Sequence, residues 1–447
     1  MSALVHAQNS VEGFISPNID SDWLILYRIE GTEQVYVKDT KIKKDSIAVN
    51  GDQREVGSFS ITLPKNAEPG TYRATYRLEG EGFIDFVYNK EDVSFIFNPD
   101  YPTQSVAFTQ SEENKLYKEY IEAITKVQQT LDSIQVTALQ NPELNLSEAY
   151  AKAYTVVKNT QTIYLEKTKG YYIHPFVKSS FRSNPKNLIP SIPEYMDHIT
   201  GTFFDKIDFT NQTLINSSFI TNRVLDYIFY IHYSEDLDEQ NVLHKRAIDT
   251  VMSKINNSSY KRDIIEFLID QFETSTNLTM IDYLFEKHYN ALPKQLQDQK
   301  FKSEKMAKFA AEVGRTAPNF SWLENGINYD LSSLNDAEHY VLVFWSTSCS
   351  HCLREIPQLY DFMKDKDQMK VIGFALENDA FVWEQYSKNN LQSWHNVLGL
   401  KKWENKTART YQINATPSYF VLDKNKKIIA KPNEFEDVKA YIQNLKM

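Results

Sequence analysis

The chain of 447 residues contains two cysteines, Cys349 and Cys352, spaced C-x-x-C in the stretch FWSTSCSHCLREIP. The preceding HYVLVFW is apolar and β-prone, and the following LREIPQLYDFM has apolar residues at helical spacing. The pair is therefore expected where a buried strand ends and a helix begins. At the first turn of a helix, unpaired amides and the positive end of the helix dipole favour a thiolate.

This position predicts thiol–disulfide exchange. We expect Cys349 to attack the disulfide of a partner and Cys352, within disulfide reach one turn further on, to resolve the mixed species. His351 lies between the two cysteines. When protonated, it is expected to lower the pKa of Cys349 further. Trp345, four residues before Cys349, is expected to pack beside the pair and limit its solvent access.

Three other uses of the pair fit the residues less well. A structural zinc site needs four ligands, whereas this stretch offers two cysteines and one histidine, and the other histidines lack metal-site spacing. A structural disulfide across C-x-x-C closes a tiny loop and adds little stability. A peroxidase would carry Pro-x-x-x-Thr-x-x-Cys, which this stretch lacks. Neither a metal nor a nucleotide cofactor is predicted.

Composition sets the class of protein around this pair. The length predicts two or three domains, and 42% hydrophobic with 24% charged residues indicates a globular chain. A formal net charge of -10 argues against a nucleic-acid partner, since no basic stripe is present to neutralise phosphates. No stretch reaches the roughly 18 to 20 apolar residues that a membrane span needs.

The amino terminus suggests export. Residues 1–8 are interpreted as the end of a signal peptide, with Val5-His6-Ala7 as a small-residue cleavage site and Gln8 as the first mature residue. Few apolar residues precede this site, so a frayed terminus stays open as the alternative. No cysteine follows the site directly, which excludes a lipid-anchored amino terminus. The expected location is the periplasm or cell envelope.

Hydrophobic periodicity divides the rest of the chain into three segments. Residues 9–107 contain short alternating runs such as DWLILYRI and GTYRATYRL between turn formers, which predicts an antiparallel β-sandwich-like domain. Residues 111–305 change to helical spacing, as in SYKRDIIEFLIDQF. Residues 306–447 alternate strands and helices around the cysteine pair, which predicts a mixed α/β sheet covered by helices.

The third segment also carries a family resemblance. APNF at 317–320, FWSTSCSHC and ATPSYFVLD together resemble a thioredoxin-fold domain of the TlpA/ResA-like group of envelope disulfide reductases. The resemblance implies that Pro417 is cis and faces the cysteines, and that the backbone of Thr416 pairs with an extended substrate. It implies protein disulfides or dithiols as substrates and another dithiol, such as a membrane reductant carrier, as the electron source.

Two residues qualify this resemblance. Glu377 follows the second main strand, where relatives carry an acidic residue that helps to move protons; a surface acid at the start of a helix is the alternative. The dipeptide Ser350-His351 replaces a gap that holds proline in many relatives, and a histidine there favours a more oxidising pair. The direction of electron flow therefore stays open.

The first two segments loosely resemble a layout that precedes such domains in Gram-negative envelope proteins, without a catalytic motif to carry over. They make up about two thirds of the chain. A second hypothesis follows from them: a binding or scaffold protein of the cell envelope in which the cysteine pair is only a redox switch. A fully buried pair would favour this alternative over an enzyme.

Overall fold

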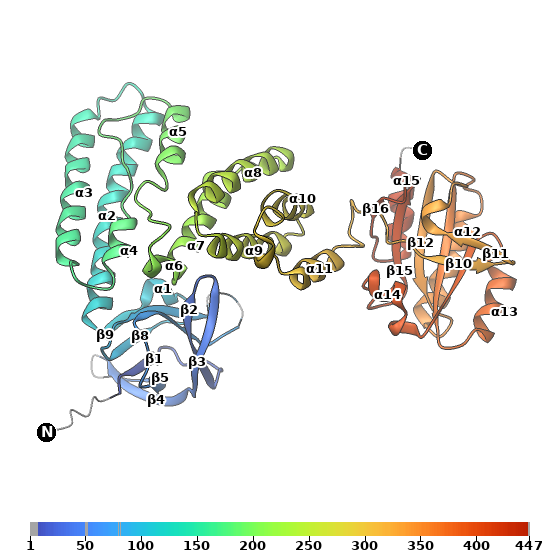
Figure 1. Ribbon diagram of the computed structural model, residues 1–447, viewed down its shortest axis with the longest axis horizontal. Coiled ribbons are helices and arrows are strands. Elements are labelled where there is room, and N and C mark those ends of the chain that lie inside the picture. Colours follow the sequence, from blue (N-terminus) through green and yellow to red (C-terminus); the bar gives the residue numbers. More distant parts are fainter. Residues whose placement is uncertain (1–7, 50–51, 79, 81, 446–447) are drawn as a thin grey trace. The chain divides into compact units, whose positions relative to one another are not determined.

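The computed structural model describes residues 8–49, 52–78, 80 and 82–445. The predicted cleavage site at residues 5–7 lies outside the described residues. The chain divides into two compact units, Met1–Gln297 and Asp298–Met447 (Figure 1). The first unit holds a β region and a helical region, and the second holds a mixed sheet covered by helices. This is the multidomain fold class that the sequence predicts.

The β region is built from two sheets, with strand orders β4-β5-β1-β8-β9 and β3-β2-β6-β7. The strands are β1 (Ser10–Ile15), β2 (Trp23–Glu30), β3 (Glu33–Lys41), β4 (Lys43–Val49), β5 (Asp52–Thr62), β6 (Gly70–Thr75), β7 (Phe83–Tyr88), β8 (Val93–Phe97) and β9 (Ala107–Gln110). Alternating residues such as Leu24 and Leu26 of β2 are buried, and they join Phe59 and Phe95 of the other sheet in one core. The two sheets therefore enclose a shared apolar layer.

One pairing in this region departs from the predicted antiparallel arrangement. β1 pairs with β5 antiparallel but with β8 parallel, in a register that sets Gly13 opposite Phe95. Strand periodicity indicates which residues face the core, but it carries no information about the direction of a partner strand that is distant in the sequence. The predicted antiparallel β domain therefore contains one parallel pair of strands.

The helices of the first unit follow β8, and the first of them, α1, precedes β9. These α-helices are α1 (Pro102–Ser105), α2 (Glu112–Gln140), α3 (Ser147–Lys167), α4 (His174–Ser179), α5 (Ile192–Thr202), α6 (Gln212–Ile215), α7 (Ser218–Leu225), α8 (Leu237–Lys254), α9 (Ser258–Thr274) and α10 (Leu278–Tyr283). Two π-helices, η1 (Asp226–Ile231) and η2 (Leu284–Tyr289), continue α7 and α10, and η3 (Lys294–Leu296) is a 3-10 turn. α2 and α3 lie side by side (Figure 1). Side-chain oxygens of Ser111, Asp236 and Asn257 cap α2, α8 and α9.

The second unit is centred on a five-stranded sheet of order β14-β13-β12-β15-β16. Its elements are α11 (Gln299–Lys308), β10 (Ser321–Glu324), β11 (Ile327–Asp330), η4 (Leu331–Ser333), β12 (His339–Trp345), α12 (Ser350–Met363), β13 (Met369–Glu377), α13 (Phe381–Asn390), β14 (His395–Leu400), η5 (Lys402–Glu404), α14 (Lys406–Thr410), β15 (Ser418–Asp423), β16 (Ile428–Ala430) and α15 (Phe435–Asn444). β12 pairs with β13 in parallel and with β15 antiparallel.

β12 is buried on both faces, which explains why its sequence is continuously apolar. On one face, Val341 and Val343 pack with Ile356 of α12 and Val438 of α15. On the other face, alternate residues such as Leu342 pack with the β10–β11 hairpin and the α14 segment. The strand that leads to Cys349 is therefore held between two apolar layers, and its end has little freedom to move.

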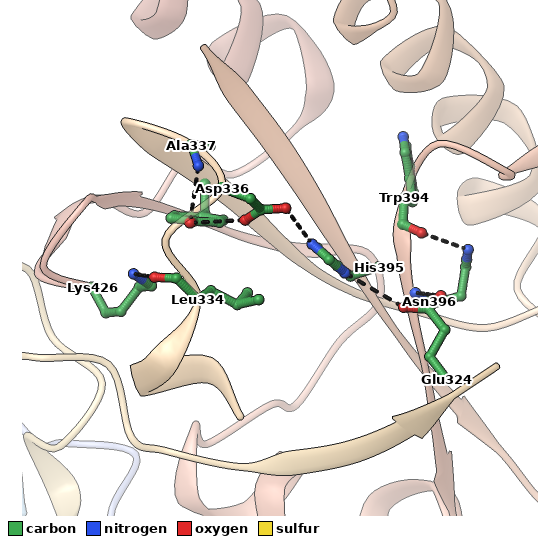
Figure 2. A network of polar contacts seen from close by, with 9 residues as sticks. Glu324, Leu334, Asp336, Ala337, Trp394, His395, Asn396 and Lys426 are labelled. Atoms are coloured by element: carbon green, nitrogen blue, oxygen red, sulfur yellow. Dashed lines mark hydrogen bonds and ion pairs between the residues drawn. The ribbon is translucent and has the colours of Figure 1, made fainter. Parts of the chain in front are cut away.

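A polar network ties the β10 end, the loop before β12 and the start of β14 together (Figure 2). The imidazole of His395 lies between two carboxylates, with Nδ1 3.4 Å from Glu324 Oε2 and Nε2 3.0 Å from Asp336 Oδ2. Burial acts to lower the pKa of His395, but the two carboxylates outweigh it and raise the pKa. Burial opposes the ionisation of both carboxyl groups, but hydrogen bonds, with that to His395 the largest, and the charge of His395 outweigh it and lower both pKa values.

This network predicts a pH-dependent stability of the second unit. A raised pKa of His395 contributes stability that is complete below about pH 6.5, the value of a free histidine, and is lost as pH rises through the folded-state pKa. The lowered carboxyl pKa values act in the opposite direction, so their contribution is lost as pH falls. His395→Asn should remove the loss of stability above about pH 6.5.

Urea unfolding followed by tryptophan fluorescence checks this, because five of the six tryptophans lie in the second unit. The difference in unfolding free energy between wild type and His395→Asn should be largest near pH 6 and should shrink toward pH 8. A difference that does not change over this range would show that His395 contributes by packing alone.

Candidate active site

Cys349 is the N-cap residue of α12 and follows β12 after the three residues Ser346, Thr347 and Ser348. Its Sγ accepts a hydrogen bond from the backbone N–H of Cys352 at 3.3 Å and donates one to the carbonyl oxygen of Thr416 at 3.2 Å. The thiol is partly exposed, and both cysteines are free thiols. The strand end and the helix start thus deliver a sulfur into the ring of unpaired amides at the amino end of α12.

The surroundings of Cys349 favour its thiolate. Burial acts to raise its pKa, but hydrogen bonds with the Cys352 thiol and with the backbone amides of Cys352 and His351 outweigh this, so the pKa is lowered. These donors are set by the helix start itself, so the anion needs no rearrangement to be stabilised. A lowered pKa and partial exposure are the properties of an attacking thiolate at neutral pH.

Cys352 has the opposite environment. It is fully buried among Trp345, Ile356 and Tyr419. Burial, together with the hydrogen bond to Cys349, raises the pKa of Cys352 to about 12. The two sulfurs of one motif therefore differ strongly in their readiness to ionise, and the deeper thiol has to be deprotonated within an apolar layer before it can act as a nucleophile.

The substrate-docking segment predicted from the resemblance lies against the pair. The Thr416–Pro417 peptide bond is cis, and β15 begins at Ser418. The carbonyl oxygen of Thr416 accepts the bond from the Cys349 thiol. β12 and β15 are adjacent strands, so the end of one and the start of the other meet at the same edge of the sheet.

His351 is arranged differently from the prediction. Its side chain is 59% exposed, and its Nε2 lies 3.5 Å from Glu355 Oε1 rather than against a cysteine sulfur. The contribution of this residue to the lowered pKa of Cys349 comes through its backbone amide. Sequence reasoning identified the position but assigned its effect to the imidazole.

Glu377 is the last residue of β13 and is 6% exposed, so the alternative of a surface acid is wrong. Its Oε1 accepts a hydrogen bond from the backbone N–H of Thr347 at 2.6 Å. Thr347 lies in the three-residue link between Trp345 and Cys349. The carboxylate therefore fixes the backbone that leads into the active-site helix.

A second buried carboxylate, Glu355, was not found from the sequence. It lies three residues after Cys352 on α12 and is 6% exposed. Its Oε2 accepts hydrogen bonds from the hydroxyl of Tyr419 at 3.0 Å and from the backbone N–H of Phe435 at 3.1 Å. Burial, and then the charge of Glu355, raise the pKa of Tyr419. The charges of the two cysteine sulfurs raise it further. Its i, i+3 spacing from Cys352 places both residues on one face of α12, and this spacing could have identified Glu355 from the sequence.

Trp345 is fully buried at the end of β12 and belongs to the same apolar layer as Cys352. Its ring lies 5.4 Å from that of Tyr386 on α13. The indole and the deeper thiol thus share one apolar core. Among the described residues, no group of three or more His, Cys, Asp or Glu side chains is placed to hold a metal ion.

A partly exposed thiol at a helix start, a buried thiol one turn away and the Thr416–Pro417 segment beside them are arranged as thiol–disulfide exchange requires. In agreement, residues 312–445 match the Redoxin family. The carboxy-terminal unit of the chain is thus a thioredoxin-like domain of the thiol–disulfide oxidoreductases.

Individual proteins are similar to a part of this chain. The thiol-disulfide oxidoreductase ResA of Geobacillus thermodenitrificans is 26% identical over 153 residues, which cover 31% of this chain and 81% of the relative. A thioredoxin-like protein of Haemophilus influenzae is 28% identical over 101 residues, covering 23% of this chain and 58% of the relative. A solved thiol-disulfide oxidoreductase from Bacteroides fragilis is 25% identical, with a TM-score of 0.26 over 29% of this chain and 98% of its own.

The buried carboxylate of Glu355 predicts an unequal effect of two tyrosine substitutions. Tyr419→Phe removes a donor to a charged acceptor, which should cost about 1.5 to 3 kcal/mol of unfolding free energy. Tyr411→Phe is the matched control, because the buried Tyr411 donates to the neutral carbonyl oxygen of Pro318, a bond that contributes about 0.5 to 1.5 kcal/mol. Urea unfolding of both variants measures the two costs. A larger cost for Tyr411→Phe would contradict the stronger hydrogen bond assigned to the pair of Tyr419 and Glu355.

Proposed function

We propose that the chain exchanges disulfides with proteins of the cell envelope through Cys349 and Cys352. The thiolate of Cys349 attacks a substrate disulfide, forming a mixed disulfide and releasing one substrate sulfur as a thiolate. The thiolate of Cys352 then attacks Sγ of Cys349 and releases the second substrate sulfur. After these two steps, Cys349 and Cys352 are joined in a disulfide. The substrate has gained two electrons, and its two thiolates take up two protons. The reverse sequence would oxidise a substrate dithiol.

The observation that carries this proposal is the difference between the two thiols. Cys349 is partly exposed with a lowered pKa, whereas Cys352 is buried with a pKa of about 12. A redox switch inside a scaffold protein would need no such difference and would be favoured by a fully buried pair. The partial exposure of Cys349 therefore favours the enzyme over the scaffold alternative.

Thr416 and Pro417 are proposed to dock the substrate. In the free thiol state, the Thr416 carbonyl oxygen is the acceptor for the Cys349 thiol. Ionisation of Cys349 removes that donor and frees the carbonyl for the backbone N–H of an extended substrate segment. Substrate binding and thiolate formation are thereby expected to favour one another.

Glu377 is proposed to act by holding the backbone of Thr347, and so the approach to Cys349, through their 2.6 Å hydrogen bond. The carboxylate that lies one helical turn from Cys352 is that of Glu355. Help in deprotonating Cys352 is therefore proposed for Glu355 and its partner Tyr419, in addition to the proton-transfer role that the family resemblance implies for Glu377.

The location in the cell envelope and the supply of electrons by a membrane reductant carrier are further parts of the proposal. A chain with a single cysteine pair has no other thiol to mispair in an oxidising compartment. Among the described residues, none of the helices is both long and apolar enough to cross a membrane. Fractionation of cells that produce the chain tests its location in the cell envelope. The redox state of the cysteine pair, measured in cells with and without the membrane reductant carrier, tests the supply of electrons.

Trapping of substrates tests the assigned roles. In Cys352→Ser, Cys349 can still attack, but the mixed disulfide has no internal exit. Envelope extracts should therefore contain this variant in higher-mass adducts that disappear on reduction, and mass spectrometry would identify the substrates.

The matched control is the double variant with serine at both positions, which has no thiol and should form no adducts. Adducts with Cys349→Ser but not with Cys352→Ser would show that the roles are reversed. If neither single variant forms adducts and the purified chain exchanges no disulfides, the scaffold alternative takes the place of the enzyme.

The redox potential tests the contribution of residue 351. His351→Pro removes both the imidazole and a backbone N–H that stabilises the thiolate of Cys349, so the pair should become more reducing. His351→Ala removes only the imidazole. About 30 mV corresponds to roughly 1.4 kcal/mol for a two-electron couple, so either change can be measured by redox titration.

We expect a clear negative shift for His351→Pro and a much smaller one for His351→Ala. Equal shifts in the two variants would assign the effect to the imidazole. A shift of His351→Pro to a more oxidising potential would contradict the role of residue 351 in stabilising the thiolate.

A further inference from the structure

A cavity of about 330 Å³ lies in the helical region of the first unit, outside the part of the chain that matches the Redoxin family. The segment between α4 and α5 forms one wall, α5 a second, and the end of α7 with the π-helix η1 a third. π-helical turns are rare in proteins, and those that exist are frequently found at functional sites. The volume suits a ligand the size of one sugar ring or amino acid.

The wall between α4 and α5 has no helix or strand of its own, yet it is held firmly. Four side chains on α2, α3 and α5 form hydrogen bonds with this segment. Three of them bind its backbone carbonyl oxygens: His198 Nε2 with Ser183 O at 2.7 Å, Tyr150 Oη with Pro185 O at 2.8 Å and Gln135 Nε2 with Ile189 O at 2.8 Å. The fourth, Gln128, accepts a hydrogen bond at Oε1 from Nδ2 of Asn184 at 2.8 Å. Loops of this length without secondary structure are commonly functional when they are ordered. This segment presents Arg182 and Asn184 to the cavity in a fixed arrangement.

Two guanidinium groups line the cavity, from Arg182 on this wall and Arg223 on α7. Burial and the like charge of Arg182 both lower the pKa of Arg223, against the raising effect of Asp226. The cation of Arg223 also lies over the ring of Phe203, 4.3 Å from its centroid, which fixes the plane of the guanidinium. Two like charges held near each other in a partly buried site are relieved by an anion that binds both.

Each guanidinium has donors to spare. Asp132 accepts one bond from Nη1 of Arg182 at 2.6 Å, and Asp226 accepts one from Nη1 of Arg223 at 3.1 Å. A guanidinium offers five N–H donors in a planar fork that matches the oxygens of a carboxylate or phosphate. Within the described residues, Asp226 engages one nitrogen of the Arg223 fork, and Asp132 and the hydroxyl of Tyr195 engage the fork of Arg182. Each guanidinium still has further N–H groups for a ligand.

The remaining lining supplies contacts for the body of a ligand. The rings of Tyr195 and Tyr230 border the cavity, and Tyr230 is 77% exposed although it is a large aromatic side chain. An exposed aromatic ring at the border of a polar cavity can stack on the face of a ring-shaped ligand. The polar side chains of Asn184 and His198 lie alongside.

We propose that this cavity binds a small organic oxyanion, a carboxylate or a phosphate monoester on a ring-sized body, between the guanidinium groups of Arg182 and Arg223. The anionic group bridges the two forks, and the ring lies against Tyr195 and Tyr230. The site lies in the first unit and the cysteine pair in the second, so the chain combines a redox domain with a ligand-binding region.

Isothermal titration calorimetry of the full chain at low ionic strength tests the proposal with four probes: inorganic phosphate, glucose 6-phosphate, glucuronate and glucose. Glucose 6-phosphate, glucuronate or both should bind, and glucose should not. Binding of only one of the two charged sugars identifies a phosphate or a carboxylate as the anionic group. Arg182→Gln and Arg223→Gln should each weaken that binding at least about tenfold. Arg246→Gln, an exposed arginine on α8 outside the cavity, is the matched control and should bind as wild type.

Two further variants keep the test decisive if an arginine substitution prevents folding. Arg223→Lys keeps the charge without the fork and should also weaken binding, while Tyr230→Ala changes an exposed ring and should weaken the charged sugars but not inorganic phosphate. The proposal is overturned if no charged probe binds with a dissociation constant below about 1 mM. It is also overturned if glucose binds equally well, or if Arg246→Gln weakens binding as much as the cavity variants do.

Discussion

The hydrogen bond from the backbone N–H of Cys352 to Sγ of Cys349 is the interaction on which the redox site depends. It exists because Cys349 caps α12, so the free amides of the first turn face its sulfur. The same helix turn carries Cys352 inward, away from solvent. One local geometry thus stabilises a thiolate at the surface and a thiol in the interior. Thiol–disulfide exchange needs this difference, because the attacking sulfur must be ionised before the resolving one.

The sheet makes this geometry rigid. β12 is covered on both faces, and β13 and β15 fix its edges, so the link from Trp345 to Cys349 has a fixed starting point. Two buried carboxylates secure the ends of the site. Glu377 holds the link before Cys349, and Glu355 joins α12 to β15 and to the start of α15. Each carboxylate is hydrogen-bonded, which is the condition under which a buried charge is tolerated.

Much of the redox unit could be predicted from sequence because its signals are local. The run HYVLVFW coincides with β12, and the helix after Cys349 begins at Ser350. The contacts that could not be predicted join residues far apart in the chain. Glu355 meets Tyr419 across 64 positions, and the parallel partner of β1 is β8. Periodicity shows that such residues are buried, but it does not identify the partner that satisfies them.

The position of His351 shows a second limit of the same kind. The sequence indicates a titratable side chain between two cysteines, but only the structure shows that its ring points to Glu355 and its amide to Cys349. In the helical region, the sequence pattern missed a candidate site. The segment between α4 and α5 is rich in Asn, Ser and Pro, a composition typical of turns. In the structure, hydrogen bonds from neighbouring helices hold this segment, and its Arg182 lines a cavity.

The measurement that tests the central claim most directly is the pH dependence of alkylation at each cysteine in the reduced full-length chain, resolved by peptide mass spectrometry. The alkylation rate follows the thiolate fraction of each sulfur. Cys349 should reach half of its maximal rate at a pH below that of a free cysteine, about 8.5, and Cys352 should stay unreactive until the pH approaches its pKa of about 12. Titration of both sulfurs near the value of free cysteine, or of Cys352 before Cys349, would contradict the account.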